Sequence, residues 1–257
     1  MKKDREELIY FFEQVREKSK RNYSKEISDS VKNTIVYENN IPCDFLQHKK
    51  NKIIITEGSS VDTASFYPNK KLSILNFASA YRPGGGVTAG ATAQEETLCR
   101  CSTLYEILSS KKCVENYYKK NRMENAKFGS DRIIYSPDIV FFYSDKDSEL
   151  KEIPPFKADV ITCAAPNLRD IEYNSDEIRR ILLERYSNIF KSAYLHGSEI
   201  LVLGAIGCGV FKNPAGIVAQ VMKDLCDKYA SFEEIIFPIY NSAELLDVFK
   251  DIFNMQN

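Results

Sequence analysis

The feature that most constrains the fold is the alternation of short apolar runs with longer stretches of helical spacing. Runs rich in Ile, Leu and Val predict strands at residues 34–37, 52–56, 72–77, 132–135, 139–143, 159–164, 199–203 and 234–239. Helical patterns occupy residues 93–109, 175–195, 214–229 and 243–253. This alternation predicts a mixed, largely parallel sheet with helices on both faces, a three-layer α/β/α fold.

Residues 4–30 place apolar side chains at helical spacing among charged ones, which predicts an N-terminal helical extension. We expect this extension, residues 1–50, to pack on a core domain formed by residues 51–257. The segments 111–132 and 144–157 are rich in polar residues and are predicted to be surface excursions from the sheet. Asn213 is a candidate N-cap, because Pro214 follows it at a position that suits the first turn of a helix.

The composition excludes several classes of protein. With 35 basic and 36 acidic residues in 257, the net charge of -1 gives no bulk attraction for DNA or RNA, so we expect no general nucleic-acid binding. Seven cysteines without CxxC spacing fit reduced thiols in a cytoplasmic protein. No apolar run approaches the length of a membrane span, so we expect no membrane partner, and we expect a monomer.

Two glycine-rich loops follow predicted strands, where ligands bind in open α/β sheets. The first lies in LNFASAYRPGGGVTAGATAQEE, residues 75–96, and the second is GAIGCGVFKNP, residues 204–214. Glycines let backbone amides approach anionic oxygens, so the two loops are predicted to hold a diphosphate from both sides. Glu95 and Glu96 open a helix directly after the first loop and place two carboxylates beside that anion.

Each of these features also has a purely structural interpretation. The triple glycine could be a flexible turn, the glutamates could complement a helix dipole, and Asn76 could organise its loop. Known nucleotide signatures are absent, since no GK[ST] follows the glycines and the GxGxxG spacing is not met. The two histidines lack metal-ligand spacing, and there is no GxSxG motif for a serine nucleophile.

The combination resembles a known family. GGG, seven intervening residues and QEE, preceded by LNFAS and followed much later by LGAIGCGVF, is similar to the microbial-type poly(ADP-ribose) glycohydrolases, whose catalytic unit is a macrodomain. Residues 135–145 and 161–167 are also similar to family sequence, so the resemblance covers most of the chain. One departure is that Asn213 runs directly into Pro214, where the family pattern has an additional acidic residue.

The resemblance implies a role for each residue of the motif. Glu96 is the expected catalytic acid/base, Glu95 is expected to hold ribose hydroxyls, and Asn76 is expected to position the scissile ribose. The remaining expected substrate-binding residues are Gln94, the first-loop residues Gly84, Gly85, Gly86 and Val87, and the second-loop residues Gly207, Cys208, Gly209, Val210 and Phe211. Phe211 is expected to orient the terminal ribose, and no metal or cofactor is implied.

The activity implied is hydrolysis of the ribose-ribose O-glycosidic bonds of poly(ADP-ribose), with ADP-ribose as the product. Two alternatives remain open from the sequence. One is a non-catalytic macrodomain that recognises ADP-ribose, and the other is hydrolysis of a different ADP-ribosyl linkage, on mono-ADP-ribosylated protein or on nucleic acid.

Overall fold

The computed structural model describes residues 4–44, 51–145 and 150–254. Its centre is a seven-stranded sheet in the order β1-β4-β5-β3-β6-β7-β2. The strands are β1 (Ile35–Tyr37), β2 (Lys52–Glu57), β3 (Leu72–Phe77), β4 (Ile133–Ser144), β5 (Lys151–Cys163), β6 (Ile200–Val202) and β7 (Glu234–Ile239).

The sheet is parallel over most of its width. β2, β7, β6, β3 and β5 pair in parallel, whereas β4 runs antiparallel to both of its neighbours, β5 and β1. The parallel strands therefore all present their carboxyl ends at one edge of the sheet. Among the described residues, β4 is the strand that makes the sheet mixed, as the sequence predicted.

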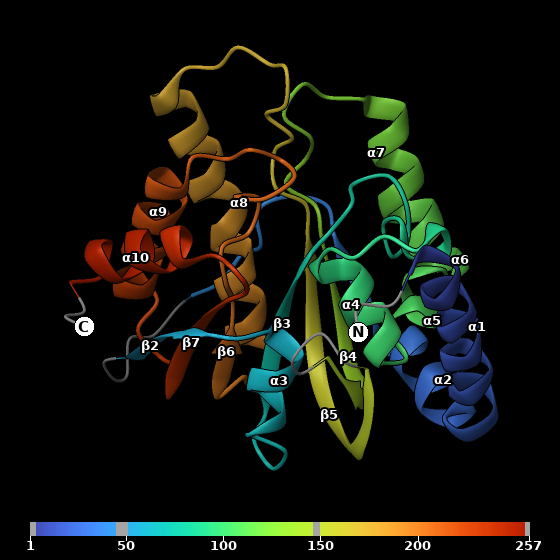
Figure 1. Cartoon of the computed structure of the whole chain (residues 1–257). Coiled ribbons are helices and arrows are strands. Elements are labelled where there is room, and N and C mark those ends of the chain that lie inside the picture. The colour runs from blue at the N-terminus through green and yellow to red at the C-terminus, as the bar shows by residue number, and fades with distance from the viewer. Residues whose placement is uncertain (1–3, 45–50, 146–149, 255–257) are drawn as a thin grey trace.

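Helices cover both faces of the sheet (Figure 1). One face carries α8 (Ser175–Leu195), α9 (Ala215–Lys228) and α10 (Ala243–Ile252). The others are α1 (Arg5–Asn22), α2 (Ser24–Asn33), α3 (Ser60–Ser65), α4 (Gln94–Cys101), α5 (Leu104–Leu108), α6 (Lys111–Cys113) and α7 (Lys119–Glu124), with a 3-10 turn η1 (Val87–Ala89) and a π-helical turn η2 (Val114–Tyr118). The predicted three-layer α/β/α fold is confirmed, and none of the helices described is long and apolar enough to cross a bilayer.

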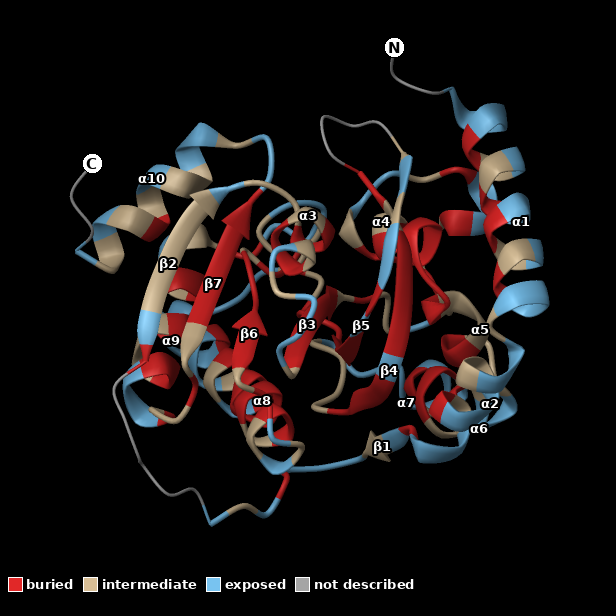
Figure 2. Cartoon of the chain, turned by 90° about the horizontal axis from the view of Figure 1, so that it is seen from below, coloured by how far each residue is buried: buried red, intermediate tan, exposed pale blue. Residues whose placement is uncertain are grey.

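Two hydrophobic cores lie on opposite faces of the sheet. Successive residues of β3 point to opposite faces, so Leu75 joins the core under α8 and α9, while Ile74 joins the core that contains Phe12 of α1 and Leu98 of α4. Figure 2 shows the central strands buried and the outer face of α1 exposed. The α1 side chains that enter the sheet core therefore tie the N-terminal helix to the same packing unit as the first loop.

The N-terminal segment is joined to the core by a strand as well as by helices. A capping box, in which the Glu7 amide donates to Asp4 Oδ1 and the Asp4 amide donates to Glu7 Oε2, starts α1. β1 then pairs with β4 and becomes part of the sheet. The predicted boundary at residue 50 falls in residues 45–50, which lie outside the described part of the chain.

Two predicted surface excursions are wrong over the described residues. The segment 111–132 is largely helical, and its Tyr117 and Tyr118 are fully buried. Residues 151–157 belong to β5, which pairs with β4 through this stretch. The first segment is held by its buried tyrosines, whereas 151–157 is mostly exposed and is held by backbone pairing with β4, and composition alone reveals neither.

Several predicted boundaries also change. The two strands predicted at 132–135 and 139–143 are one strand, β4, whose register with β5 shifts between Ser136 and Ile139. The helix predicted at 93–109 is divided at Ser102, whose backbone is extended. Asn213 does not cap α9, because its side-chain amide donates to the carbonyls of Pro166 and Gly207 instead.

Candidate active site

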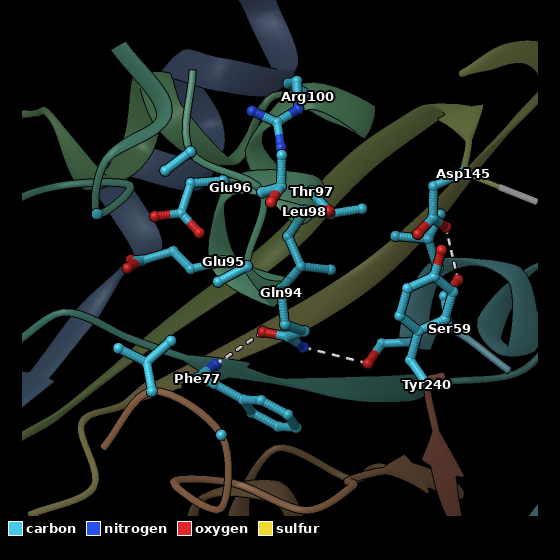
Figure 3. A pocket seen from close by; sticks show the side chains of 18 of the residues that line it. Ser59, Phe77, Gln94, Glu95, Glu96, Thr97, Leu98, Arg100, Asp145 and Tyr240 are labelled. Atoms are coloured by element: carbon cyan, nitrogen blue, oxygen red, sulfur yellow. Dashed lines mark hydrogen bonds between the residues drawn. The ribbon is translucent and has the colours of Figure 1, made fainter. Parts of the chain in front are cut away.

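A cavity of about 770 Å³ opens at the carboxyl ends of the parallel strands. Its walls come from both glycine-rich loops, from the first residues of α4, and from the segments that follow β2 and β7. Figure 3 shows Gln94, Glu95 and Glu96 along one wall, between Phe77 at the end of β3 and Arg100 further along α4. The two loops that the sequence singled out therefore meet at one site.

The triple glycine makes room for the two carboxylates. Gly85 has φ +60°, and a Cβ built on it would lie 2.5 Å from Glu96 Oε1 and 2.9 Å from Glu95 Oε2. A side chain at this position would therefore occupy the space that the carboxylates need. The glycines and the QEE motif are parts of one steric arrangement.

The amides of this loop are already hydrogen bonded within the protein. Gly86 donates its N–H to Glu96 Oε1 at 2.7 Å, and the Gly84 amide bonds to the Glu95 carboxyl group. Gly85 donates to the Arg82 carbonyl, and Val87 donates to the Gly84 carbonyl. The first loop thus uses its amides to hold carboxylates and itself, although the sequence had suggested that they would hold phosphate.

Glu95 is enclosed by the protein, with 2% of its surface exposed. Burial raises the pKa of Glu95 to about 8, against hydrogen bonds from the Ser79 amide and the Asn76 side chain that favour the charged form, and Glu96 adds to the rise by repulsion. The two bonds measure 2.7 Å from Ser79 and 3.3 Å from Asn76. At neutral pH the buried carboxyl group is mostly protonated.

Asn76 lies behind Glu95 and is fully buried at the end of β3. Its Nδ2 donates to Glu95 Oε1 and to Thr162 Oγ1 on the adjacent strand β5. Its Oδ1 is buried and has no hydrogen-bond partner among the described residues. A buried acceptor without a donor is unfavourable, so this atom is suited to a hydroxyl group of a ligand.

Glu96 differs from Glu95 in that only one of its two carboxylate oxygens is hydrogen bonded to a described residue. Its Oε1 is fixed by the Gly86 amide, while its Oε2 is buried and has no partner in the described part of the chain. The residue lines the cavity with 7% of its surface exposed. One oxygen is therefore held in place, and the other is free for a reacting group.

Gln94 holds the start of α4 against the sheet. Its Oε1 accepts a hydrogen bond from the Phe77 amide at 2.9 Å, and its Nε2 donates to the Leu75 carbonyl at 2.7 Å and to Ser60 Oγ at 3.1 Å. The side-chain amide thus joins the end of β3 to α3 and α4, as the dashed lines in Figure 3 show for two of the bonds. It lines the cavity, but its polar atoms are occupied by the protein.

The second loop is folded around Asn213. Gly207 has φ +80°, and a Cβ there would lie 2.7 Å from both Ala165 Cβ and Asn213 Nδ2. The Asn213 amide donates to the Gly207 carbonyl at 3.0 Å, and Leu168 donates to the Phe211 carbonyl at 2.9 Å. These contacts fix the two ends of the loop and leave residues 209–210 projecting at the cavity.

Several backbone amides of the second loop, unlike those of the first, have no hydrogen-bond partner among the described residues. Gly207, Gly209, Val210 and Phe211 donate no backbone hydrogen bond to any described residue. Gly207, Gly209, Val210 and Phe211 all line the cavity. A row of unsatisfied N–H groups beside a cavity is suited to an anionic group.

The structure brings most of the predicted residues to the cavity. Those that line it are Gly85, Gly86, Gln94, Glu95, Glu96, Gly207, Gly209, Val210 and Phe211. Four others stand behind the wall: Asn76 contacts Glu95, Gly84 packs on Tyr105 and Cys99, Val87 is in the hydrophobic core, and the Cys208 thiol contacts the Ile206 carbonyl at 3.8 Å.

Several lining residues were missed by sequence reasoning. Tyr240 and Asn241 follow β7 directly, so both stand at the carboxyl end of a parallel strand. The rule that located the two glycine loops would have found them, since it applies to every parallel strand of the sheet. Arg100 had no such signal, because the importance of its position depends on what its helix packs against.

Comparison with known proteins identifies the family. The family model described as microbial-type PARG, catalytic domain, matches residues 8–144, more than half of the chain. Curated protein sequences gave no match.

Solved structures agree with that family over nearly the whole chain. The poly(ADP-ribose) glycohydrolase (PARG) of Thermomonospora curvata is 27% identical, with a TM-score of 0.84, and the match covers 97% of this chain and 100% of that one. The same enzyme bound to the inhibitor ADP-HPD gives 28% identity and a TM-score of 0.82, over 96% and 99% of the two chains. The PARG of Deinococcus radiodurans in complex with ADP-ribose is 28% identical, with a TM-score of 0.76, and the match covers 89% of this chain and 96% of that one.

The family match, the macrodomain-like fold and the cavity at the QEE motif thus agree with one another. The chain belongs to the microbial-type PARG catalytic-domain family and is a glycohydrolase.

Proposed function

We propose that this enzyme cleaves the ribose-ribose O-glycosidic bonds of poly(ADP-ribose) and releases ADP-ribose, with Glu96 as its general acid and base. The observation that carries the proposal is the state of Glu96, a cavity-lining residue whose Oε1 is fixed by the Gly86 amide and whose buried Oε2 has no hydrogen-bond partner among the described residues. The relatives described as poly(ADP-ribose) glycohydrolases, one of them bound to ADP-ribose, support the choice of substrate.

The diphosphate of the substrate would be held by the second loop. Gly207, Gly209, Val210 and Phe211 carry the amides without internal partners, and they precede the N-terminus of α9, where the helix dipole favours negative charge. The first loop would instead form the opposite wall and position the carboxylates. This division differs from a clasp in which both loops donate amides to the phosphates.

The terminal ribose would lie against Asn76, Glu95 and Phe211. Asn76 Oδ1 lacks a donor, and the protonated Glu95 carboxyl group is neutral, so both can hydrogen bond ribose hydroxyls without adding negative charge beside Glu96. The Phe211 ring would pack on the sugar. Gly58 and Tyr240 also line the cavity, and we assign the adenine to the part of the wall that they form.

In this mechanism a single carboxyl group moves the protons. Glu96 first protonates the departing oxygen as the bond to the anomeric carbon breaks, and the resulting carboxylate then removes a proton from the attacking water. Glu95 is not assigned as a nucleophile, because it is buried, hydrogen bonded to Asn76 and Ser79, and mostly protonated at neutral pH. A carboxylate nucleophile would need to be ionised and to face the anomeric carbon.

The test is a comparison of wild type, Glu96→Gln and Glu184→Gln on three substrates: polymer, mono-ADP-ribosylated protein and ADP-ribosylated DNA. Glu184 is exposed on α8 and serves as a control for loss of the same charge. We expect polymer to be the preferred substrate, and Glu96→Gln to lower its turnover by about 100-fold or more, the range for a lost general acid. Glu184→Gln should match the wild type.

Binding of free ADP-ribose, measured by calorimetry, should survive in Glu96→Gln. A Glu96→Gln enzyme that hydrolyses polymer at nearly the wild-type rate would refute the role of Glu96. A wild type that leaves polymer intact but cleaves one of the other two substrates would refute the proposed linkage.

A further inference from the structure

Arg100 is a buried cation that forms no neutralising contact with the described residues. It lies one helical turn after Glu96 on α4 and has 2% of its surface exposed. Its Nη1 is buried without a hydrogen-bond partner, and its guanidinium forms no ion pair with any described residue. Other buried arginines are bonded: Arg185, for example, donates to Asp131 and to the Ala164 carbonyl.

Such a state is unfavourable in the absence of a ligand. Burial lowers the pKa of Arg100, yet arginine stays protonated in proteins, so a full positive charge remains. A buried charge costs free energy unless hydrogen bonds and an opposite charge compensate it. Arg100 is therefore suited to bind an anionic group that the described residues do not supply.

Two carboxyl groups lie in the field of Arg100 but are engaged elsewhere. Asp145 accepts a hydrogen bond from Ser59 Oγ at 2.5 Å, and burial raises its pKa, which favours its neutral form. Glu96 accepts a hydrogen bond from the Gly86 amide through Oε1 and is assigned above to proton transfer. Neither carboxyl group forms a hydrogen bond or an ion pair with the Arg100 guanidinium in the described part of the chain.

Arg100 lines the same cavity as Glu96. Leu8 of α1, Ala91, Thr97 and Leu150 also belong to the wall of that cavity. In Figure 3 Arg100 lies beyond Glu95 and Glu96 as seen from Phe77. Residues four apart on a helix share a face, so a group bound at Arg100 would adjoin the oxygen that Glu96 protonates.

We propose that Arg100 binds a phosphate of the leaving group, the 5′-phosphate on the adenosine ribose that departs when Glu96 protonates the glycosidic oxygen. This inference rests on the proposed function, because it assigns the next unit of the polymer to the second part of the same cavity. In that polymer a single ribose ring separates the departing 2′-oxygen from the 5′-phosphate. The free Oε2 of Glu96 and the free guanidinium of Arg100 are satisfied by one leaving group that has both features.

The experiment uses two substrates that differ in one phosphate. In both, C1″ of ADP-ribose is joined to a 2′-oxygen, which belongs to AMP in the first substrate and to adenosine in the second. Values of kcat/KM are measured for wild type, Arg100→Gln, Arg100→Lys and Arg180→Gln. Arg180 is exposed on α8 outside the cavity wall and controls for the loss of one positive charge.

We expect the wild type to favour the AMP substrate, and Arg100→Gln to lose about tenfold or more in kcat/KM on it, as for a charge-assisted hydrogen bond. The adenosine substrate should change little. On the AMP substrate, the kcat/KM of Arg100→Lys should fall between those of the wild type and Arg100→Gln, because lysine keeps the charge without the planar guanidinium group. Arg180→Gln should match the wild type on both substrates.

Equal losses of Arg100→Gln on the two substrates would show that Arg100 only supports the fold and would overturn the proposal. If Arg100→Gln does not fold, the wild type decides: equal kcat/KM on the two substrates contradicts a phosphate site. Inorganic phosphate is a separate probe. If it stabilises wild type but not Arg100→Lys against heat, while the substrates are not distinguished, Arg100 binds free phosphate and the leaving-group assignment is wrong.

If the wild type cleaves neither compound, the enzyme does not hydrolyse the proposed 1″→2′ glycosidic bond. The proposed function and the inference would then both be wrong. A wild type that cleaves both compounds without distinguishing them supports the function while it refutes the role of Arg100.

Discussion

At the scale of single residues, the triple glycine and the glutamate pair depend on each other sterically. The free space above Gly85 is filled by carboxylate oxygens of Glu95 and Glu96, and the Gly86 amide fixes one of those oxygens. The glycines and the glutamates therefore act together to position the Glu96 carboxyl group. How well each glycine tolerates substitution should follow from the distance between an added Cβ and these carboxylates.

Gly85→Ala should abolish activity in a protein that still folds. Its methyl group would lie 2.5 Å from Glu96 Oε1, closer than atoms can pack, so the carboxylate must move. Gly197→Ala is the matched control, because Gly197 also has positive φ (+72°) but has nothing within 4 Å of its Cβ. Both variants should lose about 1 kcal/mol of stability from backbone strain, measured by denaturant unfolding.

Turnover of polymer separates the two effects, since only Gly85→Ala should lose it. Comparable activity in the two alanine variants would mean that the carboxylate position is not set by the glycine. Comparable inactivity would mean that strain alone is responsible.

Glu95 should make the stability of the protein depend on pH. Its pKa of about 8 lies above the ordinary value of 4.5, so between these values the folded state keeps a proton that the unfolded state has released. The free energy of unfolding must then fall as pH rises through this window, by up to a few kcal/mol, at about 1.4 kcal/mol per pKa unit. Denaturant unfolding at pH 5 and pH 8 measures the fall.

Glu95→Gln removes the titrating group, so the difference between the two pH values should shrink in this variant. Glu184→Gln, on the exposed face of α8, should keep the wild-type difference. An unchanged pH dependence in Glu95→Gln would show that Glu95 is ionised in the folded enzyme, which would remove one argument against its acting as a nucleophile.

At the scale of elements, the site depends on how α4 is joined to β3. The predicted ranges of β3, β7 and α8 agree with the structure to the residue, because apolar periodicity and flanking turn residues mark them clearly. The two site loops were found because each follows such a strand. Contacts between elements were not predictable, so the sequence did not reveal that the side-chain amide of Gln94 is bonded to Phe77, Leu75 and Ser60.

Burial explains what else the sequence did not reveal at this scale. Tyr117 and Tyr118 lie in a segment whose lysines suggested a surface, yet both rings are in the core. Arg100 looks in sequence like an ordinary basic residue near a helix end, where it would favour the dipole. Its significance arises from its burial without a partner, which only the packing of α1, α4 and β4 reveals.

Gln94→Ala should lower kcat more than it raises KM. The substitution leaves the Phe77 amide and the Leu75 carbonyl without partners and loosens the N-terminus of α4, which carries both glutamates. We expect a loss of about 1–3 kcal/mol in stability for the unsatisfied groups. Steady-state kinetics on polymer, with thermal unfolding alongside, give the two quantities.

Gln220→Ala is the matched control, because the Gln220 amide donates to Asp224 on the exposed face of α9. It should leave both kcat and stability near the wild-type values. A Gln94→Ala enzyme with wild-type kcat and a raised KM would instead favour direct contact between Gln94 and substrate.

At the scale of the whole molecule, the N-terminal helices and the catalytic loop belong to one packing unit. Gly90, at the end of the first loop, meets α1 so closely that a Cβ there would lie 2.6 Å from the Arg5 carbonyl oxygen. Phe12 is fully buried in the core that also contains residues of β3, β4 and α4, and Leu8 lines the cavity. We propose that α1, although it belongs to an extension in the sequence, forms part of the wall of the active site.

Phe12→Ala tests this proposal against Tyr10→Ala on the same helix. Phe12 is fully buried and Tyr10 is 68% exposed, so the first variant should lose about 3–5 kcal/mol of stability and the second close to none. Because α1 shares its core with the sheet, the loss should appear as a shift of one unfolding transition, followed in parallel by far-UV circular dichroism and by polymer hydrolysis. An early transition that unfolds some helix while hydrolysis persists would show instead that the extension folds and acts separately from the core.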